Sequence, residues 1–304
     1  MTTLPAPTAL SVDAPRPFSA TAGAYFRLTK PRVIELLLVT AVPPMFLAQH
    51  GVPPVGLMLA VVVGGALAAG GANTINCWME RDRDQLMRRT LARPLPQGEI
   101  VPSHALIFGI VLNAIAFVLL TSAANLLAAS LTLSATLFYV FVYTWWLKPR
   151  TVQNIVIGGA AGAVPALVGW AAVTGSLAVP AWILFGVVFF WTPAHFWALA
   201  LKYRDDYAAA GIPMLPVVRG VEATTRQIAG YAMVTVAMTF AMTLTGEVGR
   251  FYAASVLVLG VLFVGRALAL VVTPTPKAAI RFFGWSNVYL MLVFVAVAVD
   301  ALLR

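Results

Sequence analysis

The chain of 304 residues is 61% hydrophobic and only 10% charged, and its mean hydropathy is +0.88. Soluble domains are typically about 45–50% apolar and about 25% charged, so the composition excludes an ordinary soluble globular protein. The net charge of +9 therefore indicates membrane topology and attraction to anionic lipid, and we expect no nucleic-acid binding.

Long apolar runs define the predicted elements. Only helices and closed barrels satisfy their backbone groups in lipid, and runs of about 17–25 apolar residues fit helices. The sequence thus predicts an all-α polytopic membrane bundle of nine transmembrane helices. We expect these spans at 33–49, 55–76, 104–121, 124–147, 154–174, 180–201, 227–246, 251–272 and 282–302.

The first residues differ from the rest. Segment 1–24 is rich in Pro, Ala, Thr and Ser and lacks the basic start and apolar core of a signal peptide, so it is predicted to be a disordered cytoplasmic tail before a transmembrane domain at 25–304. With the N-terminus in the cytoplasm, the inner segments hold all 20 Lys and Arg residues except Arg250 and Arg304. Because basic residues are retained inside, this bias predicts an outer C-terminus.

Acidic and basic residues gather in the inner loop after the second predicted span. Asn76, Glu80 and Asp84 are four residues apart, so on a helix they share one slowly turning face, whereas Asp82 points elsewhere. Mg²⁺ takes oxygen ligands and is usually held by one or two carboxylates plus substrate phosphates. The nearby arginines suit bidentate phosphate contacts: Arg88, Arg89 and Arg93. The alternative is an ordinary helix end with intrahelical ion pairs.

A second charged cluster follows the sixth predicted span as the first follows the second. It contains Lys202, Asp205 and Asp206. The offset suggests a weak internal repeat whose two helix ends face each other across a central cavity. Asp205 and Asp206 are then candidate ligands of a second Mg²⁺, although alone they would be ordinary surface acids.

His195 lies within the sixth predicted span, next to Pro193. An ionisable residue in lipid is a functional candidate by default, and an imidazole there can bind a haem iron or move a proton. The alternative is a neutral histidine that bonds a neighbouring helix. The small-residue runs 64–71 and 157–163 are interpreted as sites of close helix packing.

The first cluster resembles the Asn-x3-Asp-x3-Asp motif of the UbiA-type membrane prenyltransferases, with Glu80 at the middle position. Further stretches are similar to the branch of this family that farnesylates haem: 28–33, 84–95, 143–148, 154–159, 191–197 and 206–216. The resemblance runs from about residue 24 to the C-terminus. One departure is Lys202, which stands where the broader family has an acid.

The resemblance implies that 25–304 form a prenyltransferase domain in the bacterial inner membrane, with its active site facing the cytoplasm. The domain would transfer a farnesyl group from farnesyl diphosphate to a vinyl group of haem B, and water addition would give haem O and diphosphate. Mg²⁺ is the expected cofactor, and membrane lipid and a haem A synthase or terminal oxidase assembly are the expected partners. The expected catalytic residues are Asn76, Glu80, Asp84 and His195; substrate-binding residues are Arg88, Arg89, Arg93, Lys148 and Lys202; metal ligands are Asn76, Glu80, Asp84, Asp205 and Asp206.

Three other functions remain open at this point. A prenyltransferase of the same family could act on an aromatic or quinone precursor, against which the His195 segment argues. A transporter would carry charges near mid-membrane, whereas the acids here cluster at one face apart from Glu35 and Asp300. A structural subunit of a respiratory complex would not need convergent acids.

Overall fold

The computed structural model describes residues 18–304, and every regular element in that range is helical. The helices are α1 (Phe18–Leu28), α2 (Pro31–Gln49), α3 (Val55–Asp84), α4 (Pro102–Ala123), α5 (Leu126–Leu137), the π-helix η1 (Phe138–Leu147), α6 (Asn154–Thr174), α7 (Val179–Lys202), α8 (Arg204–Ala209), α9 (Leu215–Val218), α10 (Gly220–Ala241), the 3₁₀ helix η2 (Met242–Thr245), α11 (Arg250–Val272) and α12 (Pro276–Leu303). The all-α prediction is confirmed for this range.

Within residues 18–304, eight helical segments are long and apolar enough to cross a membrane. They are α3, α4, α5 with η1, α6, α7, α10 with η2, α11 and α12. The chain is therefore an integral membrane protein. The apolar part of α2, Ile34–Gln49, is shorter, so the ninth span and the orientation of the two termini stay predictions.

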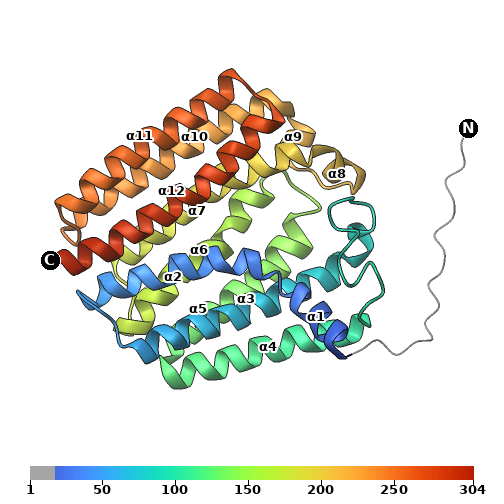
Figure 1. Cartoon of the computed structure of the whole chain (residues 1–304), viewed down its shortest axis with the longest axis horizontal. Coiled ribbons are helices and arrows are strands. Elements are labelled where there is room, and N and C mark those ends of the chain that lie inside the picture. The colour runs from blue at the N-terminus through green and yellow to red at the C-terminus, as the bar shows by residue number, and fades with distance from the viewer. Residues whose placement is uncertain (1–17) are drawn as a thin grey trace, which may run out of the picture.

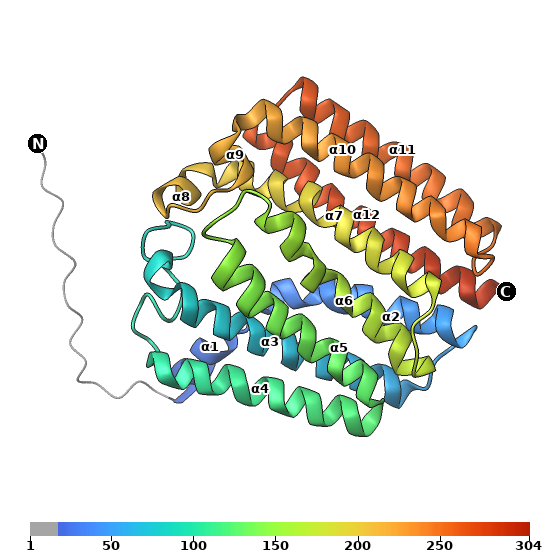
Figure 2. The same ribbon diagram turned by 180° about the vertical axis from the view of Figure 1, so that it is seen from behind.

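The long helices run side by side in one bundle (Figures 1 and 2). α7, α10, α11 and α12 form one side and α3, α4 and α5 the other, while α2 packs against α3, α6 and α12. The short helices α1, α8 and α9 gather at one end of the bundle with the connection between α3 and α4, and the C-terminus lies at the opposite end. Both charged clusters therefore lie at the same end.

Prolines and polar caps mark where the helices begin. Pro31, Pro102 and Pro276 occupy the first turns of α2, α4 and α12, where the missing N–H needs no partner. The side chain of Asn125 accepts a hydrogen bond from the backbone N–H of Ala128 at 2.9 Å, which caps α5. The chain thus turns sharply between spans with few connecting residues.

Glycines let neighbouring helices approach closely. A Cβ atom at Gly71 would lie 2.6 Å from the carbonyl oxygen of Gly109, so α3 and α4 touch through their backbones. A Cβ atom at Gly158 would lie 2.3 Å from the Tyr143 ring, which brings α6 against η1. The packing role predicted for the two small-residue runs is confirmed at these positions.

Three element boundaries in the structure differ from those predicted from the sequence. Residues 1–17 of the predicted tail lie outside the described residues, but its last part, 18–24, is helical, because Ala24 and Leu28 are buried beside Cys77. α3 continues beyond the predicted end of its span through Asp84, so the acidic motif is helical. The predicted span 124–147 is α-helical only to Leu137 and then becomes a π-helix.

Candidate active site

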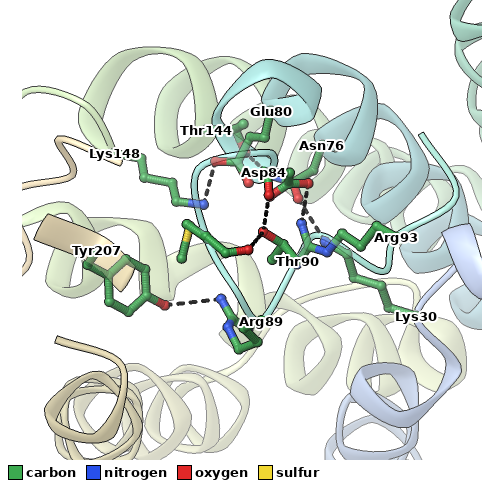
Figure 3. A network of polar contacts seen from close by, with 11 residues as sticks. Lys30, Asn76, Glu80, Asp84, Arg89, Thr90, Arg93, Thr144, Lys148 and Tyr207 are labelled. Carbon is green, nitrogen blue, oxygen red and sulfur yellow. Dashed lines mark hydrogen bonds and ion pairs between the residues drawn. The ribbon is translucent and has the colours of Figure 1, made fainter. Parts of the chain in front are cut away.

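The extension of α3 carries the first cluster on one buried face. Asn76, Glu80 and Asp84 are 2%, 4% and 2% exposed, whereas the side chain of Asp82 is 81% exposed. Figure 3 shows the three side chains turned toward basic residues from three other segments. The prediction that these three side chains share one face of the helix is therefore confirmed.

Each of the three residues has a basic partner (Figure 3). Lys148 Nζ forms an ion pair with Glu80 Oε1. The Arg93 guanidinium donates from Nη1 to Asp84 Oδ2 at 2.6 Å. Lys30 Nζ donates to Asn76 Oδ1 at 2.8 Å, so a basic side chain faces each of the three residues.

Lys30 is a site residue that the sequence reasoning missed. It joins α1 to α2 in a left-handed backbone conformation, with φ of 53° and ψ of 60°, which is uncommon for a residue other than glycine. Burial lowers the pKa of the Lys30 amino group, and its hydrogen-bond acceptor Asn76 is a neutral amide. A part-buried ammonium group that donates its hydrogen bond to a neutral amide suits an anionic ligand.

The π-helix η1 determines which side chains face this centre. Lys148 follows Tyr139 by nine residues, which is about two and a half turns of an α-helix, so ordinary α-winding would put them on opposite faces. The wider π turn rotates Thr144 and Lys148 back toward the face of Tyr139. Thr144 accepts from Asn76 Nδ2 at 3.1 Å, and Lys148 reaches Glu80. Such turns often occur at functional sites.

The second cluster meets the first through Arg89. Its backbone N–H donates to Asp206 Oδ2 at 3.2 Å, and its guanidinium donates to the Tyr207 hydroxyl at 3.5 Å. The same guanidinium lies 5.1 Å from the centroid of the Tyr203 ring. The structure therefore brings the end of α7 and α8 against the loop after α3.

Other predicted residues lie further out. Asp205 and Arg88 are exposed, and neither side chain contacts the buried centre. Lys202 is also exposed and lies over the Tyr203 ring at 5.3 Å. Tyr207, which the sequence reasoning also missed, is 1% exposed, and burial raises the pKa of its hydroxyl.

The donor set fits a magnesium ion that is completed by substrate. Within residues 18–304, no three His, Cys, Asp or Glu side chains cluster closely enough to hold a metal alone. Mg²⁺ commonly takes only one or two carboxylates and completes its shell with phosphate oxygens and water. Glu80 and Asp84, with the amide of Asn76 one helical turn before Glu80 on the same face, meet that requirement. Their basic partners would then turn to the phosphates.

An apolar cavity of about 300 Å³ begins beside this centre. At the near end it is lined by Asn73, one helical turn before Asn76, and by Tyr143, which precedes Thr144. Tyr139 also lines it, and its ring stacks on that of Tyr143 at 5.5 Å. Val61 and Val168 line its deeper part. A polar head bound at the centre could thus place an apolar chain in the bundle.

His195 faces α12. Its ring is stacked between Trp191 and Phe283, with centroid distances of 4.1 and 4.3 Å. Its Nδ1 atom lies 2.7 Å from Ser286 Oγ, and that hydroxyl donates to the Phe283 carbonyl at 2.7 Å. Since one hydroxyl has one hydrogen, Nδ1–H of His195 donates to Ser286, which leaves Nε2 as the basic nitrogen. The lining of the cavity includes Thr192 and Phe196 of α7 but not His195.

A helical membrane bundle with an acidic and basic centre above an apolar cavity defines the class of membrane prenyltransferases. The model of the UbiA prenyltransferase family matches residues 36–294, and the chain belongs to this family. It is 51% identical over 297 residues to the Protoheme IX farnesyltransferase of Salinispora tropica, covering 96% of this chain and 93% of the relative. It is 52% identical over 282 residues to the Protoheme IX farnesyltransferase of Nostoc sp., covering 92% of this chain and 88% of the relative.

Solved structures have the same fold at low identity. A digeranylgeranylglyceryl phosphate synthase structure superposes with a TM-score of 0.76 at 17% identity and covers 93% of this chain and 99% of that chain. A UbiA homologue from Archaeoglobus fulgidus, solved with GPP and Mg²⁺, superposes with a TM-score of 0.62 at 19% identity. The match covers 90% of this chain and 99% of that chain. The shared fold extends over almost the whole bundle.

Proposed function

We propose that this protein transfers a farnesyl group from farnesyl diphosphate to a vinyl group of haem B and so forms haem O. The observation that carries the proposal is the identity of about half of all residues, over nearly the full length, with relatives named for this reaction. The buried charged centre beside an apolar cavity supports the same chemistry. An aromatic or quinone acceptor is less well supported, because these relatives are named for haem.

The bond between the allylic carbon and the diphosphate oxygen breaks, and diphosphate leaves with the electron pair. The vinyl group attacks the allylic cation, which forms the new carbon–carbon bond and leaves a cation beside the porphyrin ring. Water adds to that cation and loses a proton, so the product carries a hydroxyl group.

The basic residues of the centre stabilise the leaving group. Lys148, Arg93 and Lys30 surround the metal-ligand candidates, and Arg89 stands on the side of α8. Charged donors in a buried site stabilise developing negative charge more strongly than water does. When bound through Asn76, Glu80 and Asp84, Mg²⁺ would add Lewis-acid stabilisation of the same charge. Asp206, with Asp205 beside it in sequence, is the candidate for a second ion.

The cavity residues protect the cation. The stacked rings of Tyr139 and Tyr143 line the end next to the charged centre, where their faces can stabilise positive charge. The apolar lining deeper in the bundle excludes water from the prenyl chain. Premature capture of the cation by water is thereby limited.

His195 is proposed to act on the haem, either as an axial ligand or as the base that takes the proton from attacking water. The Ser286 contact supports this role, since it leaves Nε2 unprotonated. We place the protein in the bacterial inner membrane, with this charged centre on the cytoplasmic side. A haem A synthase or terminal oxidase assembly would receive the product.

Expression in a bacterial strain that lacks haem O tests the function. Haem extracted from membranes should contain a species whose mass equals haem B plus one farnesyl group and one hydroxyl group. Membranes that contain the folded protein but only haem B, despite supplied farnesyl diphosphate, would overturn the proposal. A prenylated aromatic acid in the same extracts would favour the aromatic acceptor.

A further inference from the structure

The apolar cavity has a wall position at which glycine is not required by contact with the protein. Three glycines of α6, Gly158, Gly159 and Gly162, line the cavity. A Cβ atom at Gly158 would lie 2.3 Å from the Tyr143 ring, and one at Gly159 would lie 3.1 Å from Thr192. A Cβ atom at Gly162 would meet nothing within 4 Å. Packing therefore explains the first two glycines but not the third.

Glycine is costly at a place where nothing crowds it. Within a helix it is less favourable than alanine, because it loses more backbone entropy and packs no side chain. Gly162 lies well inside α6 and its Cα faces the cavity. The absent side chain leaves room for something that is not protein.

Gly162 also lies at an intermediate depth. α6 begins at Asn154, whose side-chain amide donates to the Lys148 carbonyl at 3.5 Å, so the first turn is beside the charged centre. At a rise of 1.5 Å per residue, Gly162 lies about 12 Å along the helix and Val168 about 21 Å. The cavity continues past Gly162 to Val168 and Val61. A side chain at 162 would therefore close the deep part and leave the part near the diphosphate open.

We propose that Gly162 sets the length of the prenyl chain that the cavity accepts, by keeping open the space beyond the middle of α6. The inference rests on the proposed use of a prenyl diphosphate and adds the determinant of chain length. The farnesyl chain passes Gly162 and its far end reaches the region of Val168. A chain one isoprene unit shorter stops nearer the charged centre and does not need that region.

The series Gly162→Ala, Gly162→Val and Gly162→Leu tests this. Substitution should shift the ratio of kcat/KM for geranyl diphosphate over farnesyl diphosphate progressively upward, by at least tenfold in Gly162→Leu. The increase should come from loss of farnesyl use, with geranyl use retained within a few fold. Gly265→Leu is the matched control: Gly265 lies within α11, its Cβ would also meet nothing within 4 Å, and it is exposed away from the cavity.

Binding measurements separate this inference from the proposed reaction. Calorimetric titration of each variant with nonhydrolysable thiolodiphosphate analogues of both prenyl diphosphates needs no haem. A selective loss of affinity for the farnesyl analogue would support the inference even if the acceptor proved not to be haem. Equal losses of affinity for both analogues, or an unchanged ratio across folded Ala and Val variants, would overturn it. The Ala and Val variants keep the test decisive if Gly162→Leu fails to fold.

Discussion

Nη1 of Arg93 lies 2.6 Å from Oδ2 of Asp84, so the ion pair ties the turn after α3 to the last residue of that helix. Thr90 strengthens this turn, since its hydroxyl donates to the Asp84 carbonyl at 2.8 Å. The Asp84 side chain is only 3% exposed. A carboxylate held this firmly by a guanidinium is positioned before substrate arrives, which is the condition for efficient electrostatic stabilisation.

Asp84→Ala should nearly abolish turnover, because it removes a charged ligand of the diphosphate centre. The matched control is Asp82→Ala, two residues earlier on the same helix, whose exposed side chain contacts only Arg81 at 3.7 Å. Steady-state rates of both variants, with folding checked by gel filtration and circular dichroism, measure the difference. Turnover of folded Asp84→Ala within a few fold of the unchanged protein would refute its assignment.

Arg93→Lys should be impaired although the charge is kept, because lysine cannot offer the planar fork of donors. A charge-assisted hydrogen bond contributes about 1.5–3 kcal/mol, so kcat/KM for farnesyl diphosphate should fall roughly ten- to hundredfold. Arg88→Lys should have a smaller effect, since Arg88 is exposed. Equal effects of the two substitutions would contradict the ranking.

Lys148→Met should destabilise the fold as well as stop catalysis. It leaves the Glu80 carboxylate, whose side chain is 5% exposed, without its ion-pair partner. Breaking one side of a buried pair costs about 3–5 kcal/mol. The double variant Lys148→Met with Glu80→Gln should recover most of the unfolding midpoint but none of the activity. Recovery of both would mean that the pair is purely structural.

Asp206→Asn should reduce activity more than Asp205→Asn does. Asp206 accepts the backbone N–H of Arg89 and so faces the first cluster, whereas Asp205 is exposed. Raised Mg²⁺ should partly restore the Asp206 variant if the carboxylate holds a second ion. If activity depends on Mg²⁺ concentration in the same way in both variants and in the unchanged protein, the proposal of a second Mg²⁺ site is contradicted.

His195→Ala should lose haem O formation while still binding farnesyl diphosphate, because the diphosphate centre uses other residues. Ser286→Ala should shift the visible spectrum of bound haem or slow product formation, and Ser286→Thr should restore both, since a hydroxyl again accepts from Nδ1. His104→Ala is the control, at an exposed position in α4. Equal loss of prenyl diphosphate and haem binding in His195→Ala would indicate a packing role.

Local sequence patterns predicted the helical membrane class and the shared face of Asn76, Glu80 and Asp84, because both follow from periodicity along one segment. They could not predict Lys30 as the partner of Asn76, since the two residues are 46 positions apart. A long-range contact between helices leaves no local periodic signal. The lysine before Pro31 could only have been noted as a basic residue at a helix start.

The π-helix was missed for a different reason. The run 138–147 has the aromatic and β-branched composition of an ordinary membrane helix, and the assumption of α-winding turns Lys148 away from Tyr139. Only the tertiary structure shows that the winding changes there. The two charged clusters were expected to face each other across a central cavity on the basis of their offset in the chain. The hydrogen bond between Arg89 and Asp206 brings them into direct contact instead.

The most direct measurement is product analysis with purified protein in lipid, supplied with haem B, farnesyl diphosphate and Mg²⁺. Mass spectrometry of the extracted haem should reveal haem O, formed in step with diphosphate release and absent when Mg²⁺ is chelated or Asp84 is replaced by Ala. Haem B that remains unmodified while the folded protein binds both substrates and Mg²⁺ would contradict the proposed function.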